Sequence, residues 1–215
     1  MILHLAEQLD VPLRDRNVLL VAAGFAPMYR QRSLDDPALQ AARRALEVVV
    51  KGHEPYPALA VDRHWTLVVA NRALSPLLTG ADPALLQPPV NVLRLSLHPA
   101  GLAPRIVNLT QWREHILARL NRQVEVTADR VLADLLVELR DYPSGSKSRD
   151  TTRAREFAGV VVPLQLNSAS GTLSFFSTTT VFGTPVDITL SELAIESLFP
   201  ADAATVEVMR RLVEV

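Results

Sequence analysis

Two short apolar runs around a polar turn, followed at once by a helix start, constrain the fold of this chain more than any other stretch. Residues 58–61 and 65–70 are rich in aliphatic and β-branched side chains, which is typical of a β-hairpin. Asn71 follows, and its side-chain oxygen can accept from a free N–H in the first turn of a helix. Leucines at helical spacing then lead to Gly80, which suits a left-handed helix end. The stretch predicts strand, turn, strand and Asn-capped helix; an ordinary hairpin before a helix has the same signature.

Further helices are predicted on both sides of the hairpin. Residues 2–24 form two short helices divided at Pro12. Asp36 is the N-cap and Pro37 the first residue of a helix that ends at Gly52. Apolar side chains at three- and four-residue spacing predict helical segments at residues 91–99, 108–120, 131–139 and 203–213.

The last third of the chain changes to a pattern typical of strands. Segments 159–166, 172–180 and 186–190 carry β-branched or aromatic side chains, with turn residues between them. Together with the hairpin they predict five strands in one antiparallel sheet covered by helices, which is an α+β fold. Residues 143–153 are polar and contain Gly and Ser, and they are the best candidate for a mobile loop.

Composition limits the classes of protein that this chain can be. Apolar residues make up 48% and charged residues 21% of the 215 residues, as in globular domains and unlike disordered chains. The net charge of −1 gives no general attraction to nucleic acid or anionic membranes. The chain has no cysteine, which excludes disulfides, thiol catalysis and thiolate metal sites. We find no secretory signal and no membrane-spanning run, so we expect a soluble cytoplasmic protein.

An enzyme or a metal site finds little support in the sequence. The five histidines, at positions 4, 53, 64, 98 and 115, fall into no metal-binding spacing. Neither a glycine-rich phosphate loop nor a nucleophile elbow occurs. Asp134 and Glu138 lie one helical turn apart, as a carboxylate pair would, but a solvated helix face is the simpler interpretation. We therefore expect no catalytic residue, no metal and no cofactor.

The first thirty residues resemble the end of a helix-turn-helix domain. Residues 5–27, LAEQLDVPLRDRNVLLVAAGFAP, are similar to the helices that follow the recognition helix in XRE-family (Cro/repressor-like) domains; an unrelated helical hairpin is the alternative. Such domains need a recognition helix that enters the major groove. We therefore expect this chain to reach DNA only through a helix-turn-helix domain that is mostly absent from it. Residues 1–30 are assigned to its remnant and residues 31–215 to a second domain.

The second domain resembles a known family of regulators. Its predicted order of two strands, helices and three strands resembles a PAS domain. The blocks LDDP, GHEPYPA, VDRHW, NVLRL, LHP and ELAIESLFPAD, at residues 34–37, 52–58, 61–65, 91–95, 97–99 and 192–202, resemble the MmyB-like transcription regulators. Those proteins join an XRE-type DNA-binding domain to a PAS-like ligand-binding domain. The resemblance implies a regulatory domain with a small, largely apolar ligand, and fatty acids are the expected class.

A PAS-like fold holds its ligand between the inner face of the sheet and the helices over it, in an apolar pocket with one or two polar groups. Candidates in the helical cover are Arg94, His98, Arg105, Asn108 and Trp112. Arg94 or Arg105 can form a bidentate pair with a carboxylate, which suits a fatty acid. Four of the candidates also have a plainer role: a surface ion pair for Arg94, helix caps for His98 and Asn108, and core packing for Trp112.

The sequence leaves two functions open. The first is the ligand-sensing domain of a bacterial XRE-family transcription regulator, in which the pocket acts on a DNA-binding domain through the helices before Tyr56. The second is a PAS-like dimerisation or interaction module without a ligand. A pocket favours the first function, and a fully packed core favours the second. We also predict a homodimer, because residues 2–24 expose apolar helix faces that a second copy can cover, and we expect no membrane partner.

Overall fold

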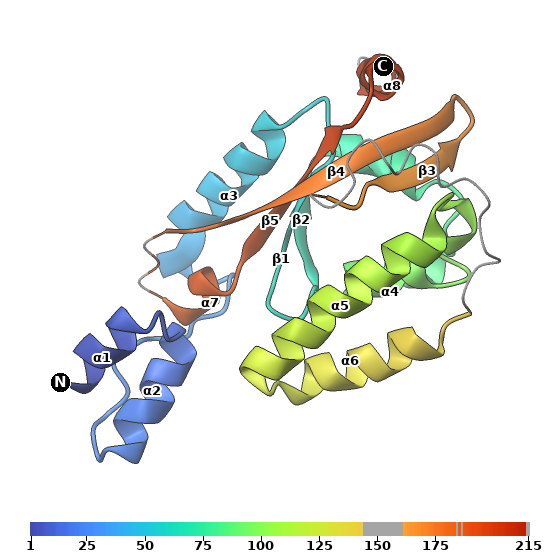
Figure 1. Ribbon diagram of the computed structural model, residues 1–215. Coiled ribbons are helices and arrows are strands. Elements are labelled where there is room, and N and C mark those ends of the chain that lie inside the picture. The colour runs from blue at the N-terminus through green and yellow to red at the C-terminus, as the bar shows by residue number, and fades with distance from the viewer. Residues whose placement is uncertain (144–160, 184, 186, 214–215) are drawn as a thin grey trace.

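The central strand of the sheet comes last in the sequence. A computed structural model describes residues 1–143, 161–183, 185 and 187–213, which form a five-stranded antiparallel sheet with helices on its two faces (Figure 1). The strands are β1 (Ala58–Val61), β2 (Leu67–Ala70), β3 (Leu164–Ser168), β4 (Gly171–Val181) and β5 (Ala194–Pro200). They lie in the order β2-β1-β5-β4-β3. This is the strand order of PAS domains, so the predicted α+β, PAS-like fold is confirmed.

Asp62 closes the predicted hairpin between β1 and β2. Its carboxylate accepts the backbone N–H groups of His64 and Thr66, each at 2.8 Å. Trp65 ends the turn with a φ of +65°, a backbone conformation that bulky residues seldom adopt. Its N–H donates to the Asp62 carbonyl and its own carbonyl accepts from Val92, so the surrounding backbone holds Trp65 in this conformation.

Asn71 does not cap the element that follows it, contrary to the prediction. Its side-chain oxygen accepts from the N–H of Ala58 at 3.1 Å, and its amide donates to the carbonyls of Val50 and Tyr56. Asn71 is buried, and a buried amide must satisfy both its donor and its acceptor groups. The side chain therefore ties neighbouring segments to β1, and the next element, η2 (Arg72–Leu78), is a 3-10 helix without a side-chain cap.

The segments between β2 and β3 form the helical layer on the inner face of the sheet. They are η2, η3 (Pro83–Leu86), α4 (Val92–Leu97), η4 (Ala103–Arg105), α5 (Leu109–Thr127) and α6 (Arg130–Asp141), which confirms the three helical segments predicted here. α5 and α6 lie side by side (Figure 1). Asp129 begins α6 by accepting the N–H groups of Val131 and Leu132. The apolar sides of these helices meet Leu59 and Val61 of β1 in the main core.

The opposite face of the sheet carries α3 (Gln40–Gly52). Leu46 and Val50 of α3 pack on Ala58 and Ala60, which alternate along β1 with the residues of the main core. Asp36 accepts the Ala38 N–H at 2.8 Å before the short turn η1 (Pro37–Leu39), so that predicted cap is confirmed. The predicted terminal helices are also present, as α1 (Ile2–Gln8), α2 (Leu13–Ala22) and α8 (Ala203–Val213). None of the helices in the described ranges has the length and hydropathy that a bilayer crossing requires.

The C-terminal strands differ from the prediction in two places. The strand predicted at 186–190 is wrong, because Ile188–Ser191 form the short helix α7. Asp187 starts this helix by accepting the Thr189 N–H at 2.9 Å, and such a cap outweighs the strand preference of β-branched side chains. The fifth strand is instead β5, and β3 begins only at Leu164. The predicted mobile loop at 143–153 lies, after Pro143, outside the described residues.

Candidate ligand-binding site

An apolar cavity of ≈ 110 Å³ lies between the inner face of the sheet and the helices over it. Leucines make up ten of its nineteen lining residues. They come mainly from η2, α4 and β3, while Leu59 and Leu198 belong to β1 and β5. The space is several times the ~10–15 Å³ that a single water molecule needs. The main core is therefore open at the position where a PAS-like fold holds its ligand.

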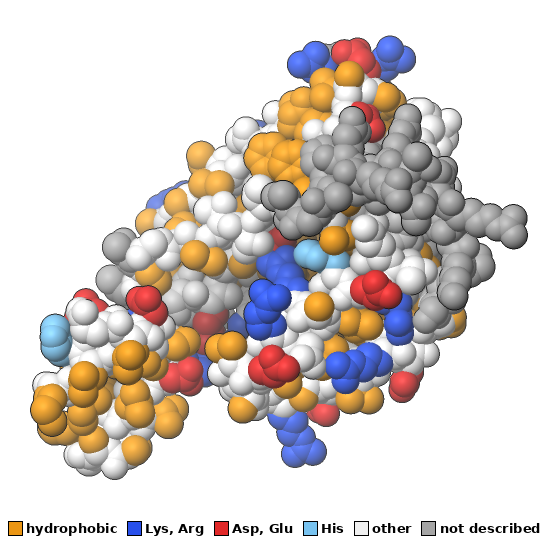
Figure 2. Space-filling view, viewed as in Figure 1, with side chains coloured by type: hydrophobic (Ala, Val, Ile, Leu, Met, Phe, Trp, Pro, Cys, Tyr) orange, Lys and Arg blue, Asp and Glu red, His pale blue; other side chains and the backbone are white. Residues whose placement is uncertain are grey.

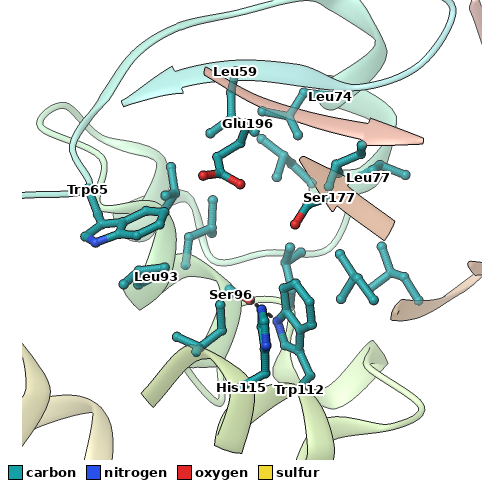
Figure 3. Close-up of a pocket in the computed structure, with 18 of the residues that line it drawn as sticks. Leu59, Trp65, Leu74, Leu77, Leu93, Ser96, Trp112, His115, Ser177 and Glu196 are labelled. Atoms are coloured by element: carbon teal, nitrogen blue, oxygen red, sulfur yellow. Dashed lines mark hydrogen bonds between the residues drawn. The ribbon is translucent and has the colours of Figure 1, made fainter. Parts of the chain in front are cut away.

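A few polar side chains interrupt this leucine wall. Ser177 and Glu196 point from β4 and β5 into the cavity, and His115 and Trp112 of α5 face them from the helical side (Figure 3). Arg119, one helical turn beyond His115, also lines the cavity. The site thus combines a hydrocarbon wall with hydrogen-bonding groups from both layers, which is the usual composition of a small-molecule site.

Arg119 and Glu196 form an ion pair at the edge of the cavity. Nη2 of Arg119 donates to Oε1 of Glu196 at 2.6 Å and to the Thr179 hydroxyl at 2.9 Å. The Thr179 hydroxyl in turn donates to the same Oε1 at 2.9 Å. The exposed fraction is 28% for the Arg119 side chain and 9% for that of Glu196. The carboxylate is therefore largely withdrawn from water, and Arg119 supplies its compensating charge.

Trp65 fixes the position of the Arg119 guanidinium. Cζ of Arg119 lies 4.5 Å from the centre of the Trp65 ring, within the range of a cation–π contact. The indole N–H donates to the side-chain oxygen of Gln123, one turn further along α5, at 2.8 Å. The unusual backbone of the β1–β2 turn therefore affects the cavity, because it positions the Trp65 indole against which the Arg119 guanidinium packs.

His115 is held against Trp112. The two rings stack with their centres 5.6 Å apart, and the Trp112 indole donates to the Ser96 hydroxyl at 3.0 Å. Burial lowers the pKa of His115 from its usual 6.5, and the nearby positive charge of Arg119 lowers it further. His115 is consequently neutral at pH 7, and the charges of Arg119 and Glu196 cancel, so the polar groups that line the cavity carry no net charge.

Arg94 lies outside the lining of this cavity. Its Nε and Nη2 each donate to one carboxylate oxygen of Glu138 on α6, both at 2.6 Å. The Tyr142 hydroxyl donates to the same carboxylate. Glu138 has a lowered pKa, chiefly because of its hydrogen bond from Arg94. Burial and the hydrogen bond to Glu138 raise the pKa of Tyr142 to about 12.

Three other predicted site residues also lie outside the lining of the cavity. Arg105 donates to the carbonyls of Leu77, Thr79 and Asn167, and so connects the end of η2 to β3. Asn108 donates to the Pro163 carbonyl and accepts from the Gln165 N–H, and its side chain makes no cap to α5. His98 accepts the Ala100 N–H and packs edge-on against Tyr142.

Of the five predicted residues, Trp112 lines the cavity. His115, Arg119, Ser177 and Glu196 were not among the candidates. Two of them were detectable, because His115 and Arg119 fall at positions i+3 and i+7 from Trp112, on the apolar side of α5. A cation and an imidazole on a core-facing helix stripe indicate a polar site. Glu196 gave a weaker signal, as one acid within a short apolar strand.

The fold and this cavity define a PAS-like ligand-binding domain. The chain belongs to the family of the MmyB-like transcription regulator ligand binding domain, which matches residues 42–212. The match leaves the N-terminal helices α1 and α2 outside the family domain. It assigns the chain to a regulatory family rather than to a family of enzymes.

Other comparisons add little. No curated protein sequence matches the chain. A solved structure of a variant of RsLOV is similar at a TM-score of 0.35 with 15% sequence identity, covering 75% of this chain and 69% of that one. This similarity is too low to bear on function. Within the described ranges, no three His, Asp or Glu side chains gather as metal ligands would.

Proposed function

We propose that this chain is the ligand-sensing part of a bacterial XRE-family transcription regulator and that the cavity beneath α4 and α5 binds a small, largely apolar molecule. The observation that carries the proposal is the leucine-lined space in the main core, bordered on the sheet side by Ser177 and Glu196 and on the helix side by His115 and Arg119. A domain with only a structural role gains stability by filling such a space. An unfilled core lowers the stability of the domain, and ligand binding explains why the space is kept open.

A fatty-acid-like molecule suits the wall of the cavity. Each methylene group buried against leucine contributes about 0.8 kcal/mol, so a short alkyl chain supplies useful affinity without any polar contact. Arg94 and Arg105 are engaged by Glu138 and by main-chain carbonyls. Among the described residues that line the cavity, Arg119 is the arginine, so a polar end of the ligand would lie near Arg119 and its partner Glu196.

A group of ion pairs offers a route from the cavity to the N-terminal helices. Glu196 and Glu192 lie four residues apart, in β5 and just before it. Glu192 accepts from Nε and Nη2 of Arg14 in α2, at 2.6 and 2.9 Å. Arg63 lies 3.6 Å from Glu192 and 2.6 Å from Asp129 at the start of α6. We therefore expect a ligand that displaces β5 or α5 to shift the position of α2. α2 lies in the segment assigned to the remnant of the DNA-binding domain.

A second function, that of a dimerisation module, is favoured by the surface of the N-terminal helices. Large apolar side chains are exposed there, namely Leu5, Leu9, Val18, Leu19, Val21, Phe25 and Met28, and Figure 2 shows hydrophobic side chains grouped at this end of the molecule. Patches of this kind mark contact sites on soluble proteins. A homodimer that pairs these helices is compatible with ligand sensing, and it also accounts for the domain if no ligand exists.

The two tryptophans provide a direct test. The chain has only Trp65 and Trp112, and both line the cavity. We expect alkyl probes such as 1-octanol to change the tryptophan emission saturably and to raise the melting temperature. Native mass spectrometry of the purified chain then reports the number of subunits and any bound small molecule. No saturable response to any alkyl probe, together with a dimer mass, would favour the dimerisation module.

A further inference from the structure

We infer that the cavity selects a ligand whose polar end is uncharged, an alcohol or a primary amide, over a carboxylate. The inference rests on the proposed function, since it concerns the ligand of the same cavity. It follows from the way in which Arg119 and Glu196 are paired.

The positive charge of Arg119 is already used within the protein. Its Nη2 lies 2.6 Å from Glu196 Oε1, and the Glu196 side chain is 9% exposed. A ligand carboxylate that captured Arg119 would leave Glu196 as a buried charge without its partner, which is strongly unfavourable. If the pair stayed intact, the ligand carboxylate would meet a second carboxylate at close range, and two such groups resist being ionised together.

The other groups around the cavity do not offset this repulsion. His115 is neutral at pH 7 because burial lowers its pKa, and Ser96 and Ser177 carry no charge. Arg94 and Arg105 are held by Glu138 and by main-chain carbonyls outside the lining. Among the described residues that line the cavity, Arg119 is the one permanent cation and Glu196 balances it.

The cavity also presents a hydrogen-bond acceptor to the ligand, Oε2 of Glu196. Both hydrogen bonds to Glu196 end on Oε1. Among the described residues Oε2 has no hydrogen-bond partner, and the carboxylate points into the cavity (Figure 3). A hydroxyl or an amide N–H can donate to this oxygen, whereas an ionised carboxylate has no proton to give. Ser177 also lines the cavity, from the neighbouring strand β4 (Figure 3), and its hydroxyl can donate to the oxygen of the same ligand group.

Three probes of equal chain length test this inference: 1-octanol, octanamide and octanoate. The full chain is titrated at about pH 7.5, where a carboxylic acid is fully ionised, with tryptophan emission and calorimetry as readouts. We expect 1-octanol and octanamide to bind at least about tenfold more tightly than octanoate, on the scale of one hydrogen bond to a charged group. Octanoate binding as tightly as the neutral probes overturns the inference and leaves the proposed function intact. If none of the three binds, the proposed function itself fails.

One substitution is expected to reverse the preference. Glu196→Gln keeps the shape of the side chain but removes its charge, so Arg119 becomes available to a ligand carboxylate. Octanoate should then bind about tenfold more tightly than it does to the parent chain, the scale of a charge-assisted pair. Glu207→Gln, an exposed position on α8, is the matched control and should change nothing. An unchanged order of the probes in a folded Glu196→Gln variant contradicts the inference; if that variant does not fold, the comparison of the three probes on the parent chain still decides.

Discussion

Two Arg–Glu pairs in this domain have the same short N···O distance and different surroundings. Arg94 and Glu138 meet at 2.6 Å between α4 and α6, with 40% and 37% of their side chains exposed. Arg119 and Glu196 meet at 2.6 Å between α5 and β5, with 28% and 9% exposed. Water solvates the charges of the first pair whether or not they are joined. In the second pair little water reaches Glu196, so its charge is stabilised mainly by Arg119. What an ion pair can do for a ligand is therefore set by its place in the fold more than by its geometry.

We call Arg119–Glu196 the inner pair and Arg94–Glu138 the outer pair. Breaking the inner pair should have the largest effect on stability. Arg119→Ala leaves Glu196 unpaired in a nearly buried position and removes the cation above Trp65, so we expect a loss of about 3 kcal/mol in the free energy of unfolding. Urea denaturation at neutral pH measures it. The double variant Arg119→Ala/Glu196→Ala should regain part of the loss, because it also removes the stranded charge. A loss below about 1 kcal/mol in the single variant would mean that water reaches Glu196 freely.

Arg14→Ala tests whether the inner pair communicates with the N-terminal helices. Arg14 makes two hydrogen bonds to Glu192 with 31% of its side chain exposed, so its removal should cost about 1.5 kcal/mol. Hydrogen exchange should also show faster opening of α2 and a loss of any response of α2 to 1-octanol. Arg16→Ala is the control, because Arg16 contacts Val11 and Tyr29 within the N-terminal segment. An α2 that still responds to the probe in Arg14→Ala would rule out this route.

The pH dependence of Tyr142, which donates to Glu138 of the outer pair, sharpens the comparison. The pKa of Tyr142 is raised to about 12 from 10, so the folded state holds this proton more tightly than the unfolded chain does. Its stabilising contribution is complete below pH 10 and is lost as the pH rises toward about 12. Ultraviolet titration should show that one of the three tyrosines ionises last, and Tyr142→Phe should remove that step. Glu138→Gln removes the second cause of the shift and leaves burial, the larger one, in place, so the step should move only part of the way back; a step that does not move at all would assign the shift to burial alone.

Local signals predicted much of this fold from the sequence. Asp36 with Pro37, the polar turn at residues 62–64 and the apolar stripes of α5, α6 and α8 each act within a few residues, so a short window is enough to recognise them. β5 escaped prediction because it is a short run with Glu196 inside it, and its pairing partners in β1 lie far away in the sequence. Asn71 misled for a related reason, since its real partners include the distant Val50 and Tyr56.

The site was harder to predict than the fold because several arginines compete for one role. Sequence spacing places Arg94 and Arg119 on helices of the same layer, and both are suited to a carboxylate. Only the packing of α5 against the sheet shows that Arg119 faces the cavity and that Arg94 faces α6. The useful signal is a cation at a core-facing position of the helix that carries Trp112. An exposed arginine such as Arg94 usually forms a bidentate pair with a carboxylate of the same protein.

Arg94→Ala should have the smallest effect and completes the comparison. The pair with Glu138 is exposed and bidentate, and exposed pairs contribute up to about 1 kcal/mol, often less. After the substitution Glu138 still accepts from the Tyr142 hydroxyl and is solvated, so no charge is stranded. We expect a loss of about 0.5 kcal/mol in urea denaturation and unchanged affinity for 1-octanol and octanoate. The same truncation at Arg119 removes the same atoms, so the difference between the two variants reports burial together with the contacts of Arg119 to Trp65 and Thr179. A weaker octanoate affinity in Arg94→Ala would return Arg94 to the ligand site and would require the cavity to extend toward α6 when it is filled.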